Sequence, residues 1–243
     1  MTHFKNLLLL LLCFTATTLL AKATTTVAIP DSIHAGFDAL LQKHVSAEGV
    51  VNYKGFKADK TALEAYLKVL SDNVPGKDTP REQAMAFWIN AYNAHTIHLI
   101  VRNYPVSSIT KLDNGKTWEV KRIKMGNKKY SLNQIENEIL RPQFQDARIH
   151  FAINCAARSC PPLYNHAFTA ENLDSTLEDR TVAFLTNEEY NSVTNKRLKI
   201  SKIFEWYAAD FGDVSKFVTK YSGKKTSAKS PIFYLDYDWD LNE

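Results

Sequence analysis

The sequence predicts an α+β fold: one helix-rich domain with a buried central helix and a small, mostly antiparallel sheet. The first observation is a long helix expected over residues 80–103, whose apolar side chains cover nearly its whole circumference. The second is that the strand-like runs are short, and that two of them flank Gly126-Asn127, a dipeptide that favours tight hairpins. The third is that helices precede and separate these strands instead of alternating with them one by one, which favours α+β over a doubly wound sheet.

Each expected element has its own sequence signal. Asp31 caps a helix expected to reach Val45, and a second helix is expected over 57–70, where apolar residues recur at helical spacing. Thr79 is the expected N-cap of the central helix, with Pro80 as its first residue. Ser131 with Gln134 is expected to open a helix that ends near Arg141. The remaining expected elements are a hairpin over 118–132, a buried strand over 148–154, a helix from 169 or 170 to 186, helices over 201–211 and 214–221, and strands over 198–201 and 231–236.

The first 23 residues have the layout of a secretory signal peptide. Lys5 precedes an apolar run from Leu7 to Leu20, and Ala21-Lys22-Ala23 supplies a small-x-small cleavage pattern. The run is too short to indicate a membrane span. We therefore expect cleavage after this pattern, a single domain over residues 24–243, and an exported protein that is periplasmic or secreted. No later segment is apolar enough to cross a bilayer, so we expect no membrane span in the mature chain.

Composition and charge limit the function classes. Hydrophobic residues make up 45% and charged residues 23% of the chain, as in ordinary globular proteins. The formal net charge is +4 and falls to about +2 without the leader, which is too small to indicate a nucleic-acid partner. We expect no cofactor, because the sequence has no phosphate loop or dinucleotide fingerprint. We also expect no metal, because His95 and His98 lie without a nearby acidic ligand and share a helix face with Arg102.

Residues 148–163 are the most informative stretch for function. His150 lies in the apolar run that predicts a buried strand, and the run ends at Cys155. Cys160 follows five positions later, in a loop that Pro161-Pro162 restricts. A histidine near a cysteine is the material of a reactive thiol site, whereas two cysteines at this spacing are also the material of a short disulfide. Both interpretations stay open.

Several motifs follow one another along the chain. They are Trp88-Ile89-Asn90-Ala91-Tyr92-Asn93, Ser131-Leu132-Asn133-Gln134-Ile135-Glu136, Arg148-Ile149-His150-Phe151-Ala152-Ile153-Asn154-Cys155, Ser159-Cys160-Pro161-Pro162-Leu163, Ser201-Lys202-Ile203-Phe204 with Asp210-Phe211, and Tyr237-Asp238-Trp239. In this order they resemble the motifs of the family called domain of unknown function 547, and the chain resembles an exported bacterial member of it. The resemblance covers about residues 31–241 and implies no general activity. The family pattern often has a histidine where this chain has Asn137, so a site that needs that histidine is not carried over.

Three residues of these motifs have the chemistry of a cysteine–histidine–acid site. Cys160 is the candidate nucleophile, His150 the general base and Glu136 the group that orients the imidazole. An adjacent imidazole lowers the pKa of a thiol and carries its proton. Each residue also has a structural explanation: Glu136 can pair with Arg141 or Arg148, His150 can be a satisfied core histidine, and Cys160 can be structural.

Four further residues are candidates for binding. Asn90 and Asn93 point from the central helix into protein, where each amide needs partners, so a core hydrogen-bond network is their alternative role. Cys155 ends the apolar run, and its alternative role is that of a buried, inert thiol. Arg148, two positions before His150, completes the set.

Two functions follow from these residues. The first is an exported cysteine-dependent hydrolase or acyltransferase of papain-like logic, which acts on amide or ester bonds in peptide, cell-wall or envelope material. It predicts that the Cys160 sulfur lies within about 4 Å of a His150 ring nitrogen, with Glu136 at the other nitrogen. The second is a non-catalytic envelope binding domain with a Cys155–Cys160 disulfide, which would block the nucleophile.

Overall fold

The computed structural model describes residues 28–227 and 230–243, so the predicted leader lies outside the described residues. Helices dominate and two small sheets complete the fold, which confirms the helix-rich α+β expectation. The α-helices are α1 (Ala35–His44), α2 (Tyr53–Ala58), α3 (Lys60–Asp72), α4 (Arg81–Asn103), α5 (Leu132–Gln134), α6 (Arg141–Phe144), α7 (Leu173–Thr186), α8 (Ile203–Trp206), α9 (Ala208–Phe211) and α10 (Val214–Ser222). The strands are β1 (Ile123–Met125), β2 (Lys128–Tyr130), β3 (Ser192–Val193), β4 (Leu198–Ile200) and β5 (Ile232–Tyr234).

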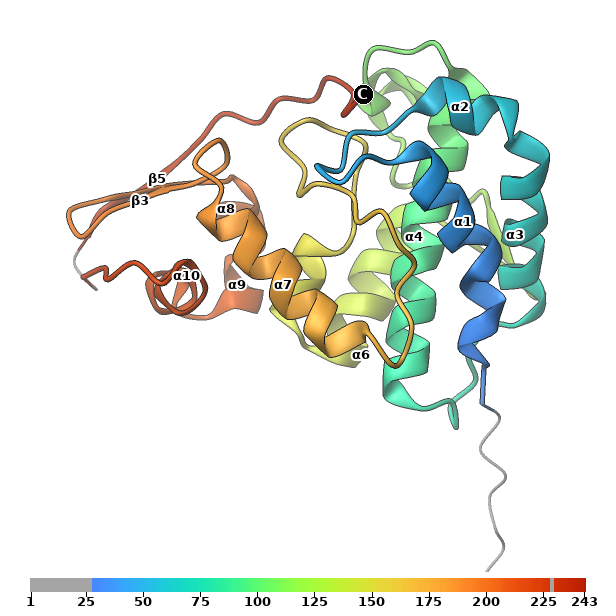
Figure 1. The fold of residues 1–243 in the computed structure, drawn as a ribbon, viewed down its shortest axis with the longest axis horizontal. Coiled ribbons are helices and arrows are strands. Elements are labelled where there is room, and N and C mark those ends of the chain that lie inside the picture. The colour runs from blue at the N-terminus through green and yellow to red at the C-terminus, as the bar shows by residue number, and fades with distance from the viewer. Residues whose placement is uncertain (1–27, 228–229) are drawn as a thin grey trace, which may run out of the picture.

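The central helix α4 matches its prediction closely. Its N-cap is Pro80, and the Thr79 hydroxyl accepts a hydrogen bond from the Gly76 N–H instead of capping the helix. The helix ends at Asn103, just before Pro105, because a residue that precedes proline disfavours helical geometry. α4 contacts α2, α3 and a π-helical segment over Ile135–Leu140, so it forms the centre of the helical half in Figure 1.

The other helices are confirmed with changed boundaries. The first begins with a 3-10 turn over Asp31–His34 before α1, and the helix predicted over 57–70 is divided at Asp59 into α2 and α3. The helix predicted after Ser131 is present with its capping box: the Ser131 hydroxyl accepts the Gln134 N–H, and the Gln134 side chain accepts the Ser131 N–H. It continues through the π-helical segment into α6.

The strand predicted over 148–154 is wrong. Ala147–Phe151 forms a 3-10 helix, and the chain then runs on as a loop that carries both cysteines. The Asp146 carboxylate caps this turn by accepting the Arg148 N–H at 3.0 Å. A short apolar run is buried equally well as a strand or as a helical turn, and periodicity does not separate the two. Within the part of the chain that the structure describes, both sheets are built from other segments and the run pairs with none of their strands.

The sheets are small and mostly antiparallel. β1 pairs antiparallel with β2 in the register Ile123↔Tyr130, which confirms the predicted hairpin in a shorter form. β4 lies between β3 and β5, antiparallel to β3 and parallel to β5. The strand β3 had not been predicted, because it has only two residues.

Two clusters of buried apolar side chains lie on either side of the cysteine loop. The larger one is built mainly on α1 to α5 and also includes Leu173 and Leu177 from the start of α7, whereas the smaller one is built on the end of α7, on α8 to α10 and on β3 to β5 (Figure 1). Ile149 belongs to the larger cluster and Phe151 to the smaller one, so the 3-10 turn joins them. Within residues 28–227 and 230–243, no helix has the length and apolar character needed to cross a bilayer.

Candidate functional site

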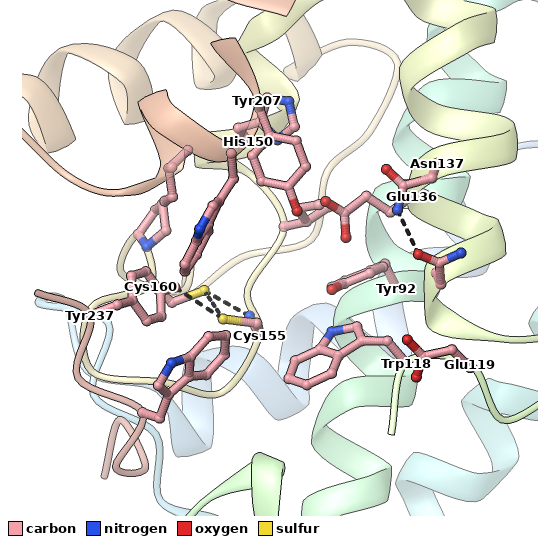
Figure 2. A pocket seen from close by; sticks show the side chains of 16 residues that line it. Tyr92, Trp118, Glu119, Glu136, Asn137, His150, Cys155, Cys160, Tyr207 and Tyr237 are labelled. Carbon is pink, nitrogen blue, oxygen red and sulfur yellow. Dashed lines mark hydrogen bonds between the residues drawn. The ribbon is translucent and has the colours of Figure 1, made fainter. Parts of the chain in front are cut away.

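A pocket of about 290 Å³ opens where the two apolar clusters meet. Figure 2 shows the thiols of Cys155 and Cys160 on one side of it and the Glu136 carboxylate on the other. The candidate catalytic residues Cys160, His150 and Glu136 all line this pocket, and so does Cys155. Most of the remaining wall is aromatic: Tyr92, Trp118, Trp206, Tyr207, Tyr237 and Trp239.

Buried asparagines hold the cysteine loop in place. Asn93 on α4 donates to the Ala152 carbonyl at 2.9 Å and accepts the Asn154 N–H at 2.8 Å. Asn154 in turn donates to the Pro161 carbonyl and accepts the Ala156 N–H, both at 2.8 Å. Because buried amides are satisfied by backbone groups, each end of the loop is fixed relative to the central helix.

The middle of the loop is held by residues 237–242. The N–H of Arg158 donates to the Asp240 carbonyl at 2.8 Å, and the N–H of Ser159 donates to the Asp238 carbonyl at 3.2 Å. Ala156 has φ 62°, the left-handed region that a residue with a Cβ adopts only at a cost. The hydrogen bonds on both sides of Ala156 hold it in that conformation and turn the chain between the two cysteines.

The two sulfur atoms are in direct contact. Cys155 Sγ lies 2.7 Å from Cys160 Sγ, and both residues are free cysteines in the structure. The backbone N–H of Cys155 also donates to Cys160 Sγ at 2.8 Å, and the Tyr237 hydroxyl lies 3.2 Å from Cys155 Sγ. Cys160 is 5% exposed, so its sulfur meets the outside through the pocket.

The surroundings favour a thiolate on Cys160 over one on Cys155. Burial acts to raise the pKa of Cys160, but hydrogen bonds from the Cys155 thiol and N–H and from Tyr237 outweigh it and lower that pKa. Burial raises the pKa of Cys155, and the neighbouring Cys160 raises it further. Burial and the two sulfurs also raise the pKa of Tyr237, which therefore stays a neutral donor. Of the two sulfurs, Cys160 is thus the one whose surroundings favour the thiolate.

His150 has Asp210 as its acid partner, rather than Glu136. Its Nε2 lies 2.8 Å from Asp210 Oδ2, and its ring stacks on Tyr207 with 4.0 Å between centroids. Arg141 binds the same carboxylate through Nε and Nη2, so the three side chains form a chain of hydrogen bonds behind the pocket. The hydrogen bond from His150 holds the pKa of Asp210 well below its ordinary range, and Arg141 acts in the same direction against burial.

The hydrogen-bond partners of His150 and Cys160 differ from the predicted triad. The structure describes no hydrogen bond between His150 and Cys160 and none between His150 and Glu136 within residues 28–227 and 230–243. The sequence reasoning did not assign a role to Asp210, although the Asp210-Phe211 motif was the signal that could have found it. The catalytic roles of Cys160, His150 and Glu136 stay predictions.

Glu136 faces Tyr207 across the pocket. The side chain comes from the π-helical segment and is 5% exposed. Figure 2 shows the Tyr207 hydroxyl and the Glu136 carboxylate directed toward each other. Burial, together with the charge of Glu136 and its hydrogen bond, raises the pKa of Tyr207. Tyr207 therefore stays protonated and donates to the carboxylate.

The other predicted residues lie away from the pocket. Asn90 donates to the Phe168 carbonyl at 2.7 Å and accepts the Phe168 N–H at 3.0 Å, so like Asn93 it belongs to a core network. Arg148 is bound by carboxylates of the surface, those of Asp146, Asp174 and Glu178. The two histidines of α4 have different surroundings. His98 lies 3.1 Å from Glu64, whereas burial lowers the pKa of His95 to about 3.

These features define a helix-rich α+β domain with a pair of thiols in an aromatic pocket. Residues 77–185 match the model of the family described as Protein of unknown function, DUF547, which supports the domain family that the motifs resemble. No curated protein and no solved structure matches the chain.

Proposed function

We propose that this protein is a cysteine-dependent hydrolase or acyltransferase in which Cys160 attacks an acyl carbon held in the pocket. The observation that supports this most is the set of donors around the Cys160 sulfur: the Cys155 N–H at 2.8 Å and the Cys155 thiol at 2.7 Å, with the Tyr237 hydroxyl next to them at 3.2 Å from Cys155 Sγ. Hydrogen bonds to the charged form lower a thiol pKa, and the thiolate is the reactive species. The substrates we propose are amides or esters of peptide, cell-wall or envelope material, met by an exported protein.

The reaction has two steps. In the first, the Cys160 thiolate forms a thioester bond to the acyl carbon, the bond to the amine or alcohol breaks, and that leaving group takes a proton. In the second, water or an acceptor amine or alcohol attacks the thioester carbon and passes its proton to His150, and the carbon–sulfur bond breaks to release the acylated product and the Cys160 thiolate. His150 is the imidazole in the same pocket, and its bond to Asp210 fixes the orientation of its ring. We propose it as the proton donor to the leaving group.

A second candidate function is a non-catalytic envelope binding domain with a Cys155–Cys160 disulfide. It is favoured by the 2.7 Å contact between the two sulfurs, which leaves little movement for oxidation to close the bridge. In that case the aromatic pocket binds a ligand without transforming it. Titration of the protein purified without reductant separates the two: two free thiols exclude the bridge, whereas none supports it.

The decisive experiment measures the reactivity of Cys160 in the reduced, full-length protein. Iodoacetamide labelling, located by peptide mass spectrometry, should be faster at Cys160 than for free cysteine at pH 7 and slow at Cys155. A p-nitrophenyl ester should acylate the same sulfur and turn over. The Cys160→Ala variant should lose both signals, while Cys155→Ser keeps the acylation. Labelling no faster than that of free cysteine, with no acyl adduct, would refute the enzyme proposal.

A further inference from the structure

The aromatic wall of the pocket is a connected set of rings, formed by Trp118, Trp206, Tyr237 and Trp239. Trp239 is its centre, with ring centroids 5.6 Å from Trp118, 5.9 Å from Trp206 and 4.6 Å from Tyr237. Trp206 is 45% exposed, so the cluster is not sealed inside the core. Open aromatic faces carry a negative electrostatic potential, which attracts cations.

Apart from His150, whose imidazole is bound to Asp210, the ionisable side chains that line the pocket beside the thiols and tyrosines are acidic. Glu136 is 5% exposed and lines it at depth, and Glu119 is an exposed residue that lines its mouth. Of the described residues that line the pocket, none is a lysine or arginine. Arg141 lies close enough for Glu136 to raise its pKa, but its guanidinium is bound to Asp210 and to Asn137.

The Glu136 carboxylate therefore lacks a cation of its own. The partner that the structure gives it is the neutral Tyr207 hydroxyl. A carboxylate taken out of water without a counter-ion is costly, and it gains when a positive charge enters its site. The Glu136 carboxylate faces a pocket with open aromatic rings, so a cationic ligand in that pocket can pair with it.

We propose that the pocket selects a substrate that carries an organic ammonium group. The inference rests on the proposed function, since the ammonium group would be the recognition handle beside the bond that Cys160 attacks. The ammonium ion would lie between Glu136 and the aromatic wall. There the ammonium ion loses its hydrating water and interacts instead with the carboxylate charge and the faces of the aromatic rings. A neutral group of the same shape fills the same space without that electrostatic gain.

The test compares two probes that differ in charge alone: choline and its neutral isostere 3,3-dimethyl-1-butanol. The protein is full-length Cys160→Ala, which binds without reacting, and the readouts are tryptophan fluorescence and calorimetry. We expect choline to bind at least tenfold more tightly than the neutral isostere. Equal affinity for the two probes, or no measurable binding of choline, would overturn the proposal.

Variants locate the cation. Glu136→Gln should weaken choline binding by tenfold or more and leave the isostere unaffected, while the exposed Glu138→Gln on the same segment serves as the matched control. Glu119→Gln, at the mouth, should weaken choline binding about two- to threefold and does not endanger the fold. Unchanged choline affinity in both Glu136→Gln and Glu119→Gln would also refute the site. Iodoacetamide labelling of the wild type uses no amine, so a failure of Cys160 reactivity is seen separately from a failure of cation binding.

Discussion

Replacing Asn93 by alanine should destabilise the protein and disturb the thiol pair together. The side chain is 3% exposed and makes two hydrogen bonds to backbone groups, one to Ala152 and one from Asn154. Both of those residues are buried at 4% exposure, so water does not replace the amide easily. Alanine would leave a buried carbonyl and a buried N–H without partners. Each such group costs about 1–3 kcal/mol.

The expected loss in the free energy of unfolding is about 2–4 kcal/mol. The two costs do not add in full, because the unpaired carbonyl and N–H are neighbours. Alanine also recovers about 0.5 kcal/mol through its better helix propensity. Urea denaturation followed by circular dichroism measures the change through the midpoint and slope. Asn103→Ala is the matched control: its amide also donates to a backbone carbonyl, that of Leu99 at 2.8 Å, but from the exposed end of α4. Its effect should stay within about 0.5 kcal/mol.

The same variant has a second readout at the thiols. Asn93 fixes the segment that leads into Cys155, whose N–H donates to the Cys160 sulfur. If that segment shifts, the donor is lost and the labelling profile of Cys160 moves to higher pH. A loss below about 1 kcal/mol, or an effect equal to that of Asn103→Ala, would show that the asparagine network does not hold the loop.

Three further predictions follow. Tyr237→Phe removes one of the hydrogen bonds that offset burial at Cys160, so the pH at which alkylation is half-maximal should rise; an unchanged profile would contradict the assignment of that donor. Gly49→Ala should lower the free energy of unfolding in urea more than Gly223→Ala does: both glycines have positive φ, but of the two only at Gly49 would the new Cβ meet backbone, 2.8 Å from the nitrogen of Leu163. The pKa of Asp210 is lowered in the folded protein, so its carboxylate stabilises the fold at pH values above the ordinary carboxyl pKa of about 3.9. That stabilisation is lost as the pH falls through the pKa of Asp210 in the folded state. The Asp210→Asn variant should therefore have a lower free energy of unfolding at pH 7, and that free energy should fall less steeply between pH 5 and pH 2 than in the wild type. Parallel plots of the free energy of unfolding against pH for the two proteins would refute the pairing.

Sequence reasoning succeeded where a local pattern decides the structure. The apolar circumference of residues 81–103 and the capping box at Ser131 each act within a few turns of helix, and both are found. It failed at 148–154, because a short apolar run does not reveal whether a strand is available beside it.

The sequence grouped three candidate residues that lie around one pocket, but it did not predict their hydrogen-bond partners. Cys160, His150 and Glu136 do line one pocket, as their shared chemistry suggested. The contact between His150 and Asp210 joins residues 60 positions apart, and no spacing rule reaches across that distance. The partner of Glu136 was missed for the same reason, because Tyr207 comes to it on a different part of the chain.

The pocket divides between two stretches of sequence, and this has a consequence for how its preferences could be altered. Both thiols and Glu136 lie within residues 77–185, whereas Trp206, Tyr237 and Trp239 lie beyond them. The sulfur pair is held mainly by asparagines, and the rings near the opening contact one another. A library restricted to Trp206 and Trp239 would therefore sample new ligand preferences while the sulfur pair keeps its asparagine supports and its contact with Tyr237. The ligand preference of the pocket can in that way be changed at its rings without changing the residues that hold the two sulfurs.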